Sequence, residues 1–128
     1  MSAYRTQHAR FREAVTAVLQ IEGVDSARSE PIRPHRKLSE QFTGDDTPRP
    51  DIDGLGPWYV HTTTSEQARI GSHLDAATLA ASLAGSDRRP AVIVYRRGAP
   101  ISEAYAVMSL ETLAGVLARD LERERVDA

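Results

Sequence analysis

The strongest constraint on the fold is a continuous apolar run, Pro90-Ala91-Val92-Ile93-Val94-Tyr95. Such a run is typical of a strand that is buried on both faces of its sheet. Residues 58–64, which are rich in aromatic and β-branched side chains, predict an earlier strand. The chain between them predicts a helix that ends at Gly85, with an inner stripe of Ile70, Leu74, Ala77 and Ala81. This strand–helix–strand unit implies a parallel pair joined by a right-handed crossover.

The remaining elements extend this unit on both sides. Residues 4–20 predict a first helix, because Phe11, Val15 and Val18 recur at helical spacing. Strands are expected over 24–29, 51–56 and 103–108, and a last helix over 110–125. We expect that last helix to face the core with Leu110, Leu113, Leu117 and Leu121. The order α-β-β-β-α-β-β-α predicts an α/β fold with a mixed sheet of about five strands flanked by helices.

Composition favours a single domain over residues 1–128. This length suits one modest core, and 41% hydrophobic with 27% charged residues is typical of a globular protein. The absence of cysteine excludes disulfides, thiolate metal sites and cysteine nucleophiles. No apolar run approaches the ~20 residues of a membrane span, and no secretory signal is evident, so we expect no membrane partner. Proline-rich residues 30–50 predict an irregular loop, and residues 119–128 a charged tail.

Charge limits the range of partners. Sixteen basic against eighteen acidic residues give a net charge of −2, whereas a dedicated duplex-DNA binder usually has a clear basic excess. A local basic face could still form, although a solvated mixed surface explains the same residues. The side chains that could contact phosphate are Arg33, Arg36, Lys37, Arg96 and Arg97.

The chemically informative stretch begins at Pro50-Asp51 and, after nine intervening residues, reaches His61-Thr62-Thr63. Glu13 precedes it on the first helix, and the strand pattern at 92–98 and 105–110 with a closing helix follows it. This order resembles the PD-(D/E)-x-K nuclease superfamily, and within it the Holliday junction resolvase-like proteins of actinobacterial phages. The resemblance covers roughly residues 8–118. It implies a restriction-endonuclease-like fold and a place in the bacterial host cytoplasm or in a virion.

The resemblance also implies a site for Mg²⁺ or Mn²⁺. In that family, carboxylates hold the ion, the ion polarises the scissile phosphate, and a lysine helps to orient the attacking water. Asp53 is a further candidate ligand, and Gln67 resembles a helix glutamine seen near such sites. The positions that match the family's acid, aspartate, acid and lysine are Glu13, Asp51, His61 and Thr63.

Two of these positions depart from the family pattern. His61 stands where an acid is expected, and Thr63 stands where the lysine is expected. A neutral imidazole is a poor ligand for a hard cation, and threonine supplies no positive charge. Only Lys37, from the preceding loop, could replace that charge. We therefore expect vestigial catalytic positions and metal binding that is weak or lost.

Each candidate residue also has a purely structural interpretation. Glu13 can be a solvated helix charge, and Arg96-Arg97 a polar hairpin end. Asp51 and Asp53 are turn formers beside Gly54, and His61 can be a packed, hydrogen-bonded histidine. Gln67 can complete a capping box with Thr64. The residues of a Ser65–His61–Asp51 triad are present, but the G-x-S-x-G nucleophile elbow is not.

Three functions follow from this sequence. The first is a catalytically degenerate nuclease-like protein that binds branched or duplex DNA. The second is a structural or adaptor protein of a phage particle or its assembly, which uses the fold to bind protein. The third is an active metal-dependent endonuclease with a rearranged site. Because related resolvases are two-fold dimers, we also expect a homodimer with contacts on the last helix and near Tyr105.

Overall fold

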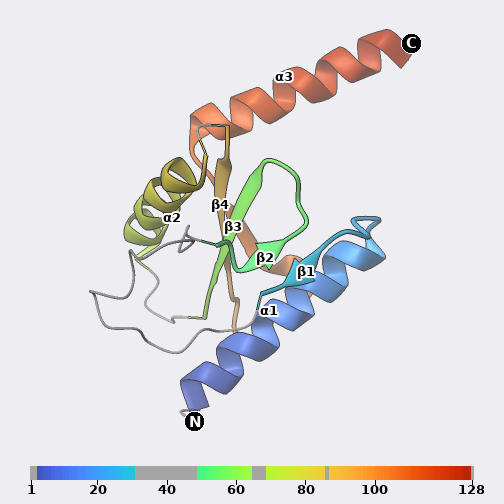
Figure 1. Cartoon of the computed structure of the whole chain (residues 1–128). Coiled ribbons are helices and arrows are strands. Elements are labelled where there is room, and N and C mark those ends of the chain that lie inside the picture. The colour runs from blue at the N-terminus through green and yellow to red at the C-terminus, as the bar shows by residue number, and fades with distance from the viewer. Residues whose placement is uncertain (1–2, 31–48, 65–68, 86, 128) are drawn as a thin grey trace.

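The computed structural model describes residues 3–30, 49–64, 69–85 and 87–127 (Figure 1). Its elements follow the predicted order, with one short 3-10 helix, η2, added before the last strand. They are α1 (Ala3–Ile21), β1 (Arg28–Ser29), β2 (Ile52–Asp53), β3 (Trp58–Thr63), α2 (Ile70–Ala84), β4 (Arg89–Val94), η2 (Ile101–Glu103), β5 (Tyr105–Val107) and α3 (Leu110–Asp127). Most of the proline-rich stretch at 30–50 lies outside the described residues.

The strands form one mixed sheet of five, in the order β1-β2-β3-β4-β5. β1, β2 and β3 are antiparallel neighbours, β3 and β4 are parallel, and β5 returns antiparallel to β4. The parallel pair is in register from Trp58 opposite Arg89 to Thr63 opposite Val94. The predicted α/β fold with a mixed five-stranded sheet is therefore confirmed, including the crossover through α2.

The two faces of the sheet carry separate cores. α1 packs Phe11 and Val15 against one face, where Ile52, Val60 and Ala91 are buried. α2 covers the other face with Ala77, which packs against Val92 and Val94. Side chains alternate along β4, so Ala91 and Ile93 face α1 while Val92 and Val94 face α2. This alternation explains why the apolar run of β4 is continuous rather than interrupted by polar residues.

α2 begins later than the sequence predicted. Its first residue is Ile70 and its N-terminal cap is Arg69, which makes no side-chain capping bond. The expected helix start after Thr64, including the capping partner Gln67, involves residues 65–68, which lie outside the described part. Ala77 and Ala81 are buried as predicted, but Ile70, the first residue of the helix, is exposed.

The prediction that the leucines of α3 face the core is wrong. Leu110, Leu113, Leu117 and Leu121 are all exposed. The reason is visible in Figure 1, where α3 leaves the end of β5 and runs away from the sheet instead of folding back over it. α3 is helical to Asp127, through most of the predicted charged tail. Among the described residues, no helix has both the length and the apolar character needed to cross a bilayer.

Candidate functional site

Asp51 directly precedes β2 and lies beside the second half of β3, and it is almost fully buried. Its backbone is fixed on both sides, because its N–H donates to the Val60 carbonyl at 2.9 Å and its carbonyl accepts from the Glu30 N–H at 2.8 Å. Its side chain reaches across to β3. There, Oδ2 accepts from the Thr62 N–H at 2.7 Å and from the Thr62 hydroxyl at 2.9 Å. The carboxylate is thus held in one orientation by β3.

α1 brings Arg12 and His8, one helical turn apart, onto this carboxylate. Arg12 donates from Nη2 to Asp51 Oδ1 at 2.7 Å and from Nη1 to the Glu30 carbonyl at 3.0 Å. His8 Nε2 lies 3.1 Å from the Thr62 carbonyl and 2.9 Å from its hydroxyl. A proton on Nε2 can serve both oxygens, while the hydroxyl donates to Asp51. These contacts form one continuous polar network, which we call the Asp51 network: His8, Arg12, Asp51, His61 and Thr62.

His61 joins the network from the other face of the sheet. Its Nδ1 lies 3.6 Å from Asp51 Oδ1, and its ring lies 5.1 Å from the ring of Tyr59. About a third of its side chain is exposed, whereas His8 and Arg12 are mostly buried. His61 is therefore the member of the network that is most open to solvent. Thr63 shares its strand face by the two-residue repeat, as predicted, and is buried.

The surroundings shift three pKa values. Burial alone would raise the pKa of Asp51, but His61, Arg12 and the Thr62 N–H outweigh it and bring that pKa below its usual value. Burial lowers the pKa of His8, aided by Arg12 and partly opposed by Asp51. Burial and the Asp51 charge raise the pKa of Tyr59 to about 12. The buried network thus favours an ionised Asp51 beside a neutral His8.

The other predicted site residues do not join this network. Glu13 is exposed on α1 rather than turned toward Asp51. Asp53 lies 3.7 Å from Arg28 in a mostly exposed ion pair. Arg96 stacks on the Tyr105 ring at 4.4 Å and donates to the Glu103 carbonyl at 3.2 Å, and Arg97 is exposed. Gln67, Arg33, Arg36 and Lys37 lie outside the described residues.

The Asp51 network is a poor fit for a hard metal ion. Within the described part of the chain, no three His, Asp or Glu side chains are grouped so that they could hold one. Asp51 is the only carboxylate of the network, and hydrogen-bond donors already meet both of its oxygens. Mg²⁺ needs about six oxygen ligands in near-octahedral geometry. The cationic group beside Asp51 is a guanidinium.

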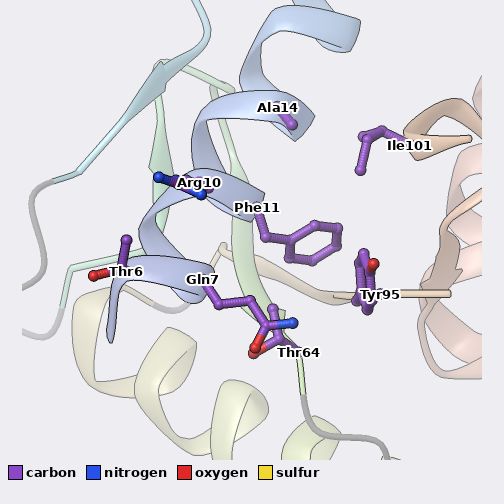
Figure 2. Close-up of a pocket in the computed structure, with 8 residues that line it drawn as sticks. All are labelled: Thr6, Gln7, Arg10, Phe11, Ala14, Thr64, Tyr95 and Ile101. Carbon is purple, nitrogen blue, oxygen red and sulfur yellow. The ribbon is translucent and has the colours of Figure 1, made fainter. Parts of the chain in front are cut away.

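A cavity of about 520 Å³ lies beside the network, between α1 and the ends of β3 and β4 (Figure 2). Phe11 and Tyr95 form its apolar wall, with ring centres 5.3 Å apart in an edge-to-face arrangement. Gln7 and Thr64 lie together at its polar end, and Ile101 closes the opposite side. The Thr64 hydroxyl is buried and has no hydrogen-bond partner among the described residues. The size of this cavity is that of a small-molecule pocket.

Arg12 and His8 are the network residues that the sequence reasoning missed. The angular position of each residue around the predicted helix could have identified them. At 100° per residue, His8 and Arg12 flank the Phe11–Val15 stripe that packs on the sheet, whereas Glu13 lies on the opposite side of α1. The stripe therefore already placed Arg12, and not Glu13, toward the sheet.

In comparisons with known proteins, no family model, curated protein or solved structure matches this chain.

Proposed function

We propose that this chain is a nuclease-like domain that does not cleave nucleic acid and acts by binding. One observation carries the proposal: the Arg12 guanidinium contacts Asp51 Oδ1 at 2.7 Å. In the nucleases that the sequence resembles, the matching aspartate binds the catalytic metal ion. A guanidinium neutralises a carboxylate equally well, but it has no open coordination position at which to activate water.

The remaining chemistry of the site supports the same proposal. Thr62 presents an N–H and an O–H toward Asp51 Oδ2, and both donors occupy lone pairs that a metal ion would need. His61 and Thr63 occupy the positions at which the resemblance calls for an acid and a lysine. Binding of Mg²⁺ or Mn²⁺ is accordingly weak or lost in this proposal.

The exposed leucines of α3 favour a protein as the bound partner. Apolar stripes of this kind mark protein interaction surfaces more often than DNA-binding ones, which are polar and basic. This supports an adaptor or structural role in a phage particle or its assembly, in a bacterial host cell or a virion. Branched or duplex DNA is the second candidate partner, through the arginines at 96 and 97.

The direct test is a cleavage assay on four-way junctions and linear duplexes with Mg²⁺ and with Mn²⁺. We expect no product above that of Asp51→Ala, with circular dichroism confirming that the variant is folded. His61→Ala serves as a second comparison, because His61 is more exposed and its loss disturbs the fold less. Metal-dependent cleavage by the wild-type protein that either variant abolishes would establish an active endonuclease and overturn the proposal.

DNA binding is tested by anisotropy over a salt series. Each phosphate contact adds about −0.9 to the slope of log K against log salt, so the five predicted arginine and lysine contacts allow at most about −5. We expect weak binding with a shallower slope, because Arg96 already pairs with Tyr105 and Glu103. Nanomolar binding at physiological salt would make DNA the principal partner.

A further inference from the structure

The cavity beside α1 lies at the carboxyl ends of the parallel strands β3 and β4 (Figure 2). Thr64 directly follows β3, Tyr95 directly follows β4, and both residues line the cavity. In open α/β sheets, ligands bind in the crevice outside the carboxyl ends of the strands. At about 520 Å³, the cavity therefore has both the position and the size of a small-molecule site.

The apolar wall of this cavity is fixed by the fold. Phe11 is only 3% exposed, and its ring meets the Tyr95 ring edge to face with centres 5.3 Å apart. The Tyr95 N–H donates to the Thr63 carbonyl at 3.0 Å, which holds Tyr95 beside the end of β3. On the opposite side, the Ala104 N–H donates to the Ile101 carbonyl at 3.0 Å. A flat aromatic ring can pack against such a preformed wall with little further ordering of the protein.

The polar end of the cavity offers hydrogen-bonding groups without charge. The exposed Gln7 side chain ends beside Thr64 (Figure 2). Its amide presents a donor and an acceptor next to each other, and a hydroxyl can play either part. The buried Thr64 hydroxyl has no hydrogen-bond partner among the described residues, so it has a bond still to make. These two groups together match a ligand that carries an N–H beside a C=O.

The charges around the cavity favour a neutral ligand over an ionised one. Of the described residues that line it, only Arg10 is charged. Arg10 is exposed, and Figure 2 shows its side chain directed away from the wall of Phe11 and Tyr95. An anion or a cation that packs against this wall would lose water without gaining an opposite charge, which is costly.

We propose that this cavity binds an uncharged, planar aromatic compound that carries an amide or lactam group. The ring of the compound packs against Phe11 and Tyr95, and its amide exchanges hydrogen bonds with Gln7 and Thr64. This proposal goes beyond the proposed function and does not rest on it. Val107 pairs with Val92, so β5 runs toward the amino end of β4, and α3 starts there, at the opposite end of the sheet from the cavity.

An NMR titration of the full chain with matched ligands tests the site. The probe is isoquinolone, a neutral two-ring lactam. Its controls are the N-methyl derivative, which lacks the N–H, and naphthoate, which has a similar shape and a negative charge. We expect isoquinolone to shift the backbone amide signals of Phe11, Thr64 and Tyr95 with a Kd on the order of 0.5 mM, as suits a ligand of this size. Both controls should bind at least fivefold more weakly.

Substitutions at the polar end separate hydrogen bonding from packing. Gln7→Met removes the amide at an exposed position, and Thr64→Val removes the hydroxyl while keeping the shape of the side chain. Each should weaken isoquinolone binding about fivefold, the loss expected for one hydrogen bond, and should change binding of the N-methyl derivative less. Thr64→Ser keeps the hydroxyl and should bind isoquinolone as the wild type does. Thr78→Val is the control, because it removes an exposed hydroxyl of α2 that donates to the Leu74 carbonyl.

Three results would overturn the proposal. The first is the absence of shifts around the cavity at about 5 mM isoquinolone, well above the expected Kd. The second is a set of shifts confined to the separate apolar groove that Trp58 and Ile93 help to line. The third is tighter binding of naphthoate that Arg10→Gln abolishes, which would make the cavity an anion site. The cleavage assay cannot produce these results, so the two proposals fail separately.

Discussion

Replacing Asp51 with asparagine tests whether the Asp51 network is a buried ion pair. Asparagine keeps the shape of the side chain and can still accept from the Thr62 N–H, but it removes the negative charge. The Arg12 side chain, 12% exposed, then loses the counterion that lies 2.7 Å away. Breaking a buried pair by removing one partner costs about 3–5 kcal/mol of unfolding free energy. We expect the cost of Asp51→Asn to lie near the lower end of this range, because part of the hydrogen bonding to Thr62 survives.

A double-mutant cycle with Arg12→Met isolates the pair from its surroundings. Arg12→Met leaves the Asp51 charge buried and loses the bond to the Glu30 carbonyl, so it also costs about 3 kcal/mol. The double variant has no unpaired buried charge. Its cost should therefore fall short of the sum of the single costs by about 2–3 kcal/mol, within the range seen for directly interacting residues.

Urea unfolding followed by circular dichroism at pH 7 measures all four proteins. Asp53→Asn is the control, because the Asp53–Arg28 pair is longer at 3.7 Å and mostly exposed. Exposed pairs contribute at most about 1 kcal/mol. If the costs of Asp51→Asn and Arg12→Met add to within about 0.5 kcal/mol, the two residues are not coupled. The carboxylate would then be available to a metal ion, and the argument against metal-dependent cleavage would fail.

Three further predictions concern the same region. Thr62→Val should destabilise the fold by about 1–3 kcal/mol in urea unfolding, because it removes the hydroxyl that donates to Asp51. Thr64→Val should be neutral or stabilising, because the Thr64 hydroxyl is equally buried but has no partner among the described residues. The reverse order of the two costs would contradict the assigned hydrogen bonds. Burial lowers the pKa of His8, so as the pH falls the unfolded chain takes up a proton on His8 at a higher pH than the folded chain does. The free energy of unfolding should therefore fall by up to about 1.4 kcal/mol per pH unit below pH ~6.5. His8→Gln should flatten that dependence, and an unchanged slope would assign it elsewhere. His61→Glu alone should give no Mn²⁺-dependent rise in Tm. The double variant His61→Glu/Arg12→Gln should show such a rise, because the added carboxylate then lacks a guanidinium to pair with. Equal responses of the two variants would show that the guanidinium does not compete with the metal ion.

The fold was predictable because its signals are local. The apolar run of β4 and the β-branched residues of β3 each identify a strand, and the helix between them leaves only one common handedness for the crossover. The start of α2 was not predictable from Thr64 and Gln67. α2 begins at Ile70 with Arg69 as its cap, and Gln67 lies outside the described residues.

The site was predictable only in part. The resemblance to the nucleases placed Asp51 and His61 in one site, but it selected Glu13 on α1 and missed Arg12, the residue next to it. The leucines of α3 show a different limit. Helical spacing identifies an apolar side, but it does not say whether that side meets the same chain or another one.

The Arg12–Asp51 pair also gives a structural reason for a buried aspartate at this position. A carboxylate with 9% of its side chain exposed requires a positive partner or a proton. A metal ion would demand further carboxylates that the network lacks, whereas a guanidinium needs only acceptors, and the Glu30 carbonyl and Asp51 Oδ1 supply them. The contacts to Thr62 then tie α1, β2 and β3 together through one side chain. Asp51 is accordingly explained by stability alone, so an aspartate at this position is by itself no argument for cleavage.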